Sequence, residues 1–137
     1  MTVFDTDVIS YLMRANPPAG LLRRIAGVPA AAHATTAITF GELVCGARRS
    51  TPPDHYLARL RELLWPNIVI LPFDAAAAER YGEVRATLAG QGTIVAEPDL
   101  RIAAICLVHG ARLATGNLRH FARIPGLDAQ DWLADYR

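Results

Sequence analysis

Short apolar runs alternate with amphipathic stretches along the chain. Four runs of apolar, small or β-branched residues are too short to be helices, so we expect buried strands at residues 2–4, 33–39, 68–71 and 112–115. Between them, apolar residues recur every three or four positions, which is the period of a helix with one buried face. The expected helices run from a cap at Asp7 to Leu12, from Leu21 to about Gly27, from Phe40 to Arg49, from Leu57 to Leu64, from a cap at Asp74 to about Leu88, and from Pro98 to Gly110.

Strands that alternate with helices, without tight hairpin signals, favour a parallel sheet covered by helices on both faces. The length of 137 residues and the hydrophobic content of 52% fit one compact domain spanning residues 1–137. No apolar stretch approaches the roughly 18–20 residues that span a bilayer, and the first residues lack the features of a signal peptide. We therefore expect a cytoplasmic protein without a membrane segment, in which Cys45 and Cys106 are buried free thiols.

The charge pattern gives weak information about partners. The net charge is only +1, and all 14 basic residues are arginine. Arginine presents a planar fork that matches phosphate, which would suit an RNA backbone. A codon bias in a GC-rich genome explains the same composition, so charge alone does not indicate a nucleic-acid-binding protein.

Four polar residues stand where apolar runs end: Asp5, Glu42, Asp99 and Asn117. Taken singly, the acids could favour the starts of helices, and the asparagine could form a turn. Taken together, they belong to the edge of a parallel sheet where ligands bind in open α/β folds. Carboxylate and amide oxygens without histidine or cysteine suit Mg²⁺ or Mn²⁺ and do not suit zinc. The pattern therefore predicts an oxygen-lined divalent-cation site.

Several segments resemble the motifs of a known family. Residues 4–10 (Phe-Asp-Thr-Asp-Val-Ile-Ser), 38–46 and 98–104 resemble the motifs of PIN-domain ribonucleases. Residues 113–121, followed by Ile-Pro-Gly-Leu at 124–127, are similar to the VapC toxin branch of that family. The resemblance covers nearly the whole chain. It implies a three-layer α/β/α domain around a mostly parallel sheet of four to five strands.

The resemblance also implies roles for individual residues. Asp5 and Asp99 would be the principal metal ligands, with Glu42 completing the acidic cluster. Asn117 stands where the family often has a fourth acid, and a neutral amide there would attract a second cation less strongly. These four residues are the expected catalytic set. Three residues are expected to arrange their surroundings: Thr6, Asp7 and Thr115.

Arg119 and His120 follow Asn117 and have two readings. They could contact RNA phosphate near the site, or they could form an ordinary surface loop paired with local carboxylates. The sequence favours neither reading.

The activity that the resemblance implies is Mg²⁺-dependent hydrolysis of RNA, with Mn²⁺ able to substitute. The protein would be the toxin of a toxin–antitoxin pair, with tRNA as the leading substrate class, and would form a homodimer. A VapB-type antitoxin would neutralise it by directing a basic side chain at the acidic cluster. Two alternatives stay open: a housekeeping PIN nuclease in RNA processing, and a non-catalytic PIN binding module.

Overall fold

A single five-stranded sheet forms the centre of the computed structural model, which describes residues 1–50, 53–64 and 67–137. The strand order is β3-β2-β1-β4-β5, and every neighbouring pair is parallel, as the sequence predicted. The strands are β1 (Thr2–Phe4), β2 (His33–Thr36), β3 (Val69–Leu71), β4 (Arg112–Thr115) and β5 (Ala129–Asp131).

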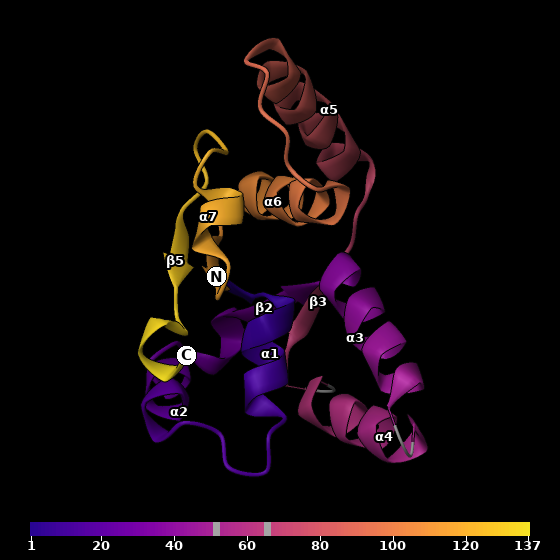
Figure 1. Cartoon of the computed structure of the whole chain (residues 1–137), viewed down its shortest axis with the longest axis vertical. Coiled ribbons are helices and arrows are strands. Elements are labelled where there is room, and N and C mark those ends of the chain that lie inside the picture. Colours follow the sequence, from indigo (N-terminus) through magenta and orange to yellow (C-terminus); the bar gives the residue numbers. More distant parts are fainter. Residues whose placement is uncertain (51–52, 65–66) are drawn as a thin grey trace.

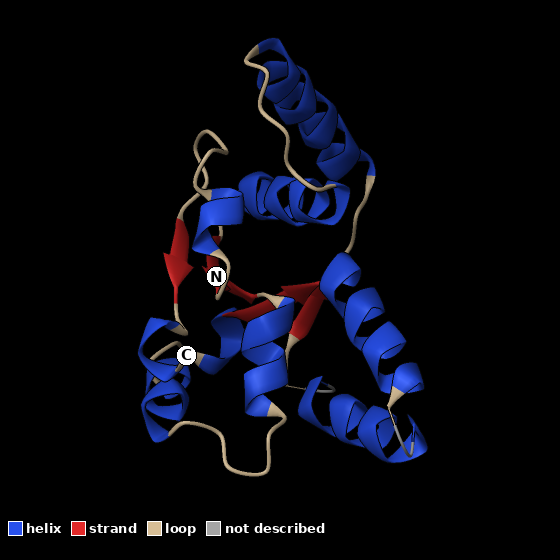
Figure 2. Ribbon diagram, in the orientation of Figure 1, coloured by secondary structure: helices blue, strands red, loops and turns tan. Residues whose placement is uncertain are grey.

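Helices cover both faces of the sheet, which confirms the α/β/α class (Figures 1 and 2). In Figure 1, α6 lies above the sheet with α5 beyond it, whereas α1, α2 and α4 lie below it. No helix within the described ranges is both long enough and apolar enough to cross a bilayer. The helices are α1 (Thr6–Leu12), α2 (Ala19–Ala26), α3 (Ala37–Arg49), α4 (Pro53–Leu64), α5 (Ala75–Gly90), α6 (Glu97–His109) and α7 (Leu118–Phe121), with short 3₁₀ turns at Ala30–Ala32 and Ala134–Tyr136.

The central strand β1 supplies both layers of the core. Successive side chains of a strand point to opposite faces of the sheet. Val3 therefore packs in one cluster with residues of α5 and α6, and Phe4 packs in the other with residues of α1, α3 and α4. Both side chains are fully buried, and burial of each contributes about 1.5–3 kcal/mol. This two-sided burial fixes the position of the residue that follows, Asp5.

The strand order places a crevice beside Asp5. The chain moves outward from β1 to β2 and β3, and then returns to add β4 on the other side of β1. Ligands in open parallel sheets bind at such a reversal, outside the carboxyl ends of the strands. Asp5 follows β1 at this point, and Gly116 and Asn117 follow β4.

The second strand is shorter than predicted. The strand expected at residues 33–39 ends at Thr36, because the hydroxyl of Thr36 accepts a hydrogen bond from the backbone N–H of Thr39 at 3.0 Å and caps a helix that begins at Ala37. This helix, α3, therefore starts three residues before the predicted Phe40. A helix that began at Phe40 would place Glu42 in its first turn. Because α3 begins at Ala37, Glu42 lies in the second turn.

Two further elements and one side chain differ from the expectation. The residue pattern did not predict α7, and β5 is a polar edge strand that was not expected either. Cys106 is buried in α6 as expected, but Cys45 is exposed on α3, so the prediction of two buried thiols is wrong for Cys45. Cys45 lies outside the buried stripe of α3, which contains Leu43 and Ala47.

Candidate active site

Asp5 is the most enclosed acid of the site, with only 5% of its surface exposed. It caps α1: its Oδ1 accepts from the backbone N–H of Thr6 at 2.8 Å. Its Oδ2 accepts from the hydroxyl of the fully buried Thr115 at 2.7 Å. The predicted cap at Asp7 is therefore wrong. Asp5 takes that position because its own backbone N–H bonds to Ala114 in β4 and holds the turn against the sheet.

Asp7 lies inside α1 and ties that helix to the loop after β4. Its Oδ2 accepts from the backbone N–H of Gly116 and from the side-chain amide of Asn117, both at 3.0 Å. Gly116 is required by close approach, because a Cβ there would collide with the Asp7 carboxylate and lie 2.6 Å from Cδ1 of Leu133. Asp7 thus positions Asn117 relative to Asp5.

Glu42 reaches the site from the exposed face of α3. Its Oε1 accepts from the hydroxyl of Thr6 at 3.0 Å, which links α3 to the first residue of α1. The other carboxylate oxygen, Oε2, has no hydrogen-bond donor among the described residues. Glu42 is therefore oriented by the protein but keeps one oxygen available.

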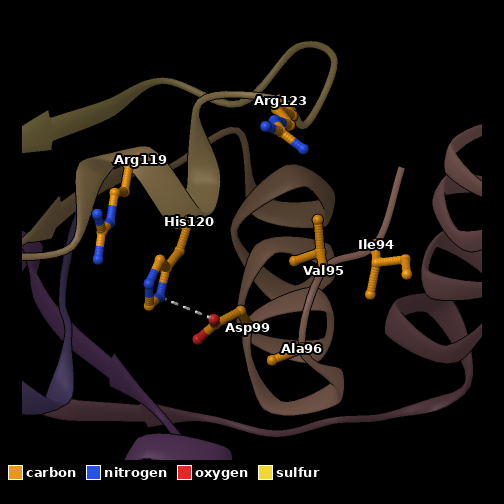
Figure 3. Close-up of a pocket in the computed structure, with 7 residues that line it drawn as sticks. All are labelled: Ile94, Val95, Ala96, Asp99, Arg119, His120 and Arg123. Carbon is orange, nitrogen blue, oxygen red and sulfur yellow. Dashed lines mark ion pairs between the residues drawn. The ribbon is translucent and has the colours of Figure 1, made fainter. Parts of the chain in front are cut away.

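Asp99 approaches from the opposite side, in the first turn of α6, where the sequence predicted it. Its Oδ2 lies 3.3 Å from Nδ1 of His120 in α7, as Figure 3 shows. Asp99 is half-buried, whereas His120 is largely exposed. The His120 contact joins α7 to α6 and holds one oxygen of Asp99.

One pocket of about 340 Å³ collects most of the predicted residues. Asp5, Thr6, Glu42, Asp99 and Asn117 all line it. Thr115 lies beneath it and is fully buried, while Arg119 and His120 lie outside its lining. We call it the acidic pocket; its lining residues are Asp5, Thr6, Asp7, Ser10, Tyr11, Arg14, Glu42, Asp99 and Asn117.

Three lining residues were not singled out from the sequence: Ser10, Tyr11 and Arg14. The guanidinium carbon of Arg14 lies 3.6 Å from the centre of the Tyr11 ring, so a cation forms part of the pocket wall. For Tyr11 the signal was helical spacing, since it follows Asp7 by four positions within α1, whereas Arg14 lies beyond the end of that helix and had no such signal.

A second arginine, also not foreseen, braces the loop of the site. Nη1 of Arg137 donates to the carbonyl oxygen of Gly116 at 2.7 Å, and Nη2 donates to Oδ2 of Asp131 at 2.7 Å. The hydrogen bond from Arg137 lowers the pKa of Asp131 below its ordinary value. The 116–117 loop is thus held by Asp7 on one side and by Arg137 on the other.

The acids of the pocket are electrostatically unfavourable as carboxylates. The pKa of Asp5 is raised to about 6, chiefly by burial and to a smaller extent by the charges of Asp7 and Asp99, while the hydrogen bonds from Thr115 and Thr6 oppose the increase. Burial also raises the pKa values of Asp7 and Asp99. His120 acts in the opposite direction on Asp99, but it does not outweigh burial. A cation placed among these groups would favour their ionised forms.

The donor set fits a hard divalent cation held partly by water. All the acceptors are oxygens, and Asp5 and Asp99 border the same pocket. Among the described residues, no three histidine, cysteine or acidic side chains are already gathered closely enough to hold an ion. Asp5 and Asp99 could hold a cation there together with water molecules, and Mg²⁺ usually keeps several waters when it binds to proteins.

Known proteins share this architecture over almost the full chain. The model of the PIN domain family matches residues 2–127. The tRNA(fMet)-specific endonuclease VapC of Shigella flexneri is 33% identical over 130 residues, covering 95% of this chain and 96% of that protein. Ribonuclease VapC2 of Haemophilus influenzae is 30% identical over 131 residues, covering 96% of this chain and 97% of that protein.

A solved structure extends the similarity to three dimensions. The DNA-bound VapBC complex of Salmonella typhimurium contains a chain that superposes with a TM-score of 0.87 at 32% identity, covering 96% of this chain and 97% of that one. The family model, the sequence relatives and the superposition all span nearly the same residues. By this match, the chain belongs to the PIN-domain family, in its VapC branch of ribonucleases.

Proposed function

We propose that this chain, acting as one domain over residues 1–137, is a Mg²⁺-dependent endoribonuclease and the toxin of a type II toxin–antitoxin pair. The observation that carries the proposal is the meeting of Asp5, Glu42 and Asp99 around one open pocket at the reversal of the strand order. A vestigial binding module would have no need to keep Asp5 and Asp99 on one pocket, where the charge of Asp99 helps to raise the pKa of Asp5. The retained cluster therefore favours catalysis over the non-catalytic alternative.

Asp5 and Asp99 would hold the cation, which Mn²⁺ could replace. When bound, the cation supplies positive charge that activates water for attack and offsets the charge of the phosphodiester. Glu42 is placed by Thr6 with one oxygen available, so it orients the attacking water or accepts its proton. Asp7 fixes the loop that carries Asn117.

Because water and not the ribose 2′-hydroxyl is the nucleophile, cleavage leaves a 5′-phosphate and a 3′-hydroxyl. Arg119 and His120 stand beside Asp99 at the rim and would contact substrate phosphates. Since His120 already holds Asp99, it would also keep that ligand in place when RNA arrives.

The substrate class that we infer is tRNA. The relative from Shigella flexneri carries the name of a tRNA(fMet)-specific endonuclease and matches this chain along 95% of its length. Growth arrest would then follow from loss of RNA needed in translation. The cytoplasm, where tRNA is found, is the compartment that we infer.

The partner that we infer is a VapB-type antitoxin, because the similar chain from Salmonella typhimurium was solved in a VapBC complex. The acidic pocket would accept a basic side chain of that partner, commonly arginine. Such a side chain would neutralise the carboxylates and displace the cation. A purified complex that kept full metal-dependent activity would contradict this mode of inhibition. The expected homodimer is checked by the molar mass of the toxin in solution.

Metal binding can be tested separately from cleavage. After chelation, Mg²⁺ or Mn²⁺ should raise the melting temperature of the wild-type protein, and the Asp99→Ala variant should lose most of that increase. Glu79→Gln is a matched control, because Glu79 is exposed on α5, away from the acidic pocket. An equal increase in the wild-type protein and Asp99→Ala would refute the assignment of Asp99 as a ligand.

Cleavage is tested with a purified tRNA pool and end mapping. The wild-type protein with Mg²⁺ should generate fragments with 5′-phosphates, and Asp5→Ala and Asp99→Ala should abolish them while keeping the far-ultraviolet circular dichroism spectrum. Glu79→Gln should cleave like the wild type. Cleavage of ribosomal or messenger RNA precursors in place of tRNA would favour the housekeeping alternative.

A further inference from the structure

A second pocket, of about 360 Å³, adjoins the acidic pocket. We call it the flanking pocket. On one side it is lined by Ile94 and Val95, from the segment that leads into α6, and on the other by His120 and two arginines of α7 and its end (Figure 3). Asp99 lines both pockets, so the two pockets border the same side chain. The two arginines are Arg119 and Arg123.

The two arginines of the flanking pocket are not neutralised by the protein. Neither Arg119 nor Arg123 forms an ion pair or side-chain hydrogen bond within the described part of the chain. Some other surface arginines do form ion pairs, as Arg112 does with Asp128 at 3.1 Å. Two unpaired guanidinium groups on one pocket form a site for an anion with several oxygens, and phosphate matches their forked donors.

The opposite wall is apolar and open to solvent. Ile94 is 91% exposed, the highest value among the large apolar side chains of the described residues. Val95 beside it is partly buried against the core, so the backbone that carries Ile94 is anchored. An exposed isoleucine on an anchored segment, which lines the same pocket as two arginines, offers contact to a planar apolar surface next to an anionic group.

We propose that the flanking pocket binds one nucleotide of the RNA substrate, adjacent to the scissile phosphate. Its base packs against Ile94, and its phosphate is bound by Arg119 and Arg123. The volume is that of a small-ligand site, which suits one nucleotide and not a folded stem. This inference rests on the proposed ribonuclease activity and deepens it, because it says which residues beyond the acidic pocket select the substrate.

The charge of the flanking pocket argues for RNA over the antitoxin. The antitoxin segment inferred above must bring a basic side chain to the acidic pocket, and Arg119 and Arg123 would repel such a segment at the neighbouring position. An RNA strand has the complementary charge. It would place one phosphate at the cation between Asp5 and Asp99 and the next at the arginines.

Two substitutions separate the base contact from the phosphate contact. Ile94→Ser removes the apolar surface, and its matched control is Val69→Ser, because Val69 is also an exposed apolar side chain but lies on edge strand β3. Arg123→Gln removes one charge, and its matched control is Arg80→Gln on the exposed surface of α5. The second pair corrects for any general effect of net charge on RNA affinity.

We expect Ile94→Ser and Arg123→Gln each to lower kcat/KM for RNA cleavage about fivefold to tenfold, mainly through KM, with the two controls within about twofold of wild type. The salt dependence should differ between them. Loss of one phosphate contact should reduce the slope of log affinity against log salt concentration by about 0.7 in Arg123→Gln but leave it unchanged in Ile94→Ser. Affinity is measured with the cleavage-inactive Asp5→Asn protein as background.

A scan with abasic nucleotides identifies the bound position. At one nucleotide next to the cleaved bond, removal of the base should weaken binding by the wild-type pocket about fivefold and should have no further effect in Ile94→Ser. If wild-type protein cleaves RNA but Ile94→Ser and Arg123→Gln behave like their controls, the nucleotide site is refuted while the proposed function stands. If these variants weaken only the antitoxin complex, the pocket belongs to the antitoxin and the proposal is wrong. Absence of any RNA cleavage by wild type would instead overturn the proposed function.

Discussion

The hydroxyl of Thr115 donates a 2.7 Å hydrogen bond to the carboxylate of Asp5, across 110 positions of sequence. This contact joins the ends of the adjacent strands β1 and β4. Because it favours the ionised form of Asp5, it partly opposes the effect of burial on the pKa. Thr115 therefore prepares Asp5 to act as a metal ligand near neutral pH.

Replacement of Thr115 by valine should weaken metal binding. Thr115→Val preserves shape but removes the hydrogen bond that lowers the pKa of Asp5, and we expect a loss of about tenfold in Mg²⁺ affinity at pH 7. Thr35→Val is the matched control: Thr35 is also fully buried, but its hydroxyl donates to the backbone oxygen of Phe4. The control should lose about 1 kcal/mol of stability without losing metal affinity. Calorimetric titration that gave equal affinities for Thr115→Val and wild type would contradict this role.

The metal-free protein should lose stability as the pH rises from about 4 to about 6. Burial raises the pKa of Asp5 from 3.8 to about 6, so the folded state binds a proton in this window that the unfolded state has released. The free energy of unfolding therefore falls as the pH rises through this window, and Asp5 contributes at most about 3 kcal/mol to the loss. Asp5→Asn should remove this contribution and unfold at a higher temperature than wild type at pH 7.5.

The measurement is thermal unfolding in a chelator at pH values from 4 to 8. Asp135→Asn serves as the control, because Asp135 is exposed and does not line the acidic pocket. It should reproduce the wild-type pH profile. A profile for Asp5→Asn that fell as steeply as that of the wild type would show that other groups cause the loss.

Two glycine substitutions should change the stability of the protein in opposite directions. Gly116→Ala places a methyl group against the Asp7 carboxylate and Leu133, so it should cost about 1–3 kcal/mol and impair cleavage by moving the 116–117 loop. Gly82→Ala lies in the middle of α5 with open space around the added carbon, and it should stabilise the protein by about 0.5–1 kcal/mol. Urea unfolding of both variants measures the two changes in stability. Stabilisation by Gly116→Ala would contradict the close contact of position 116 with Asp7 and Leu133.

Loss of the Arg137 side chain should loosen the active-site loop. Arg137→Gln removes the donor to the Gly116 carbonyl and the main cause of the lowered pKa of Asp131. We expect the Asp131 pKa to rise towards its ordinary value in an NMR titration, and amide exchange in the 116–117 loop to quicken. Arg112→Gln breaks a comparable exposed ion pair elsewhere and should change neither. An unchanged Asp131 pKa in Arg137→Gln would show that Arg137 does not bind Asp131 as the structure indicates.

The parts of the site that the sequence predicted are those set by strand ends. Asp5 and Asn117 follow buried strands, and Asp99 follows a proline in the first turn of a helix, so local pattern and topology together brought them to one edge. The cap of α1 was misplaced because Asp5 and Asp7 are both good capping residues two positions apart. The choice between them depends on the bond from Asp5 to Ala114, a long-range contact that no local pattern contains.

Elements without a local signal were missed for the same reason. β5 is formed by Ala129, Gln130 and Asp131, whose polarity suits an exposed edge but is equally typical of a loop. The flanking pocket depends on how two separate connections are placed in space, one carrying Ile94 and the other Arg123. The early start of α3 was the exception, because Thr36 and Thr39 carry a capping signal that their β-branched side chains concealed.

The brevity of β1 has a consequence for how this protein tolerates change. The strand has only three residues, and all of them are buried between two cores. Sliding it by one position would exchange Val3 with Phe4 in both cores at once and carry Asp5 away from Thr115. Any deletion or insertion that shifts the register of β1 should therefore impair folding and catalysis together. The position of Asp5 is set by the packing of the two cores, so neither can change without the other.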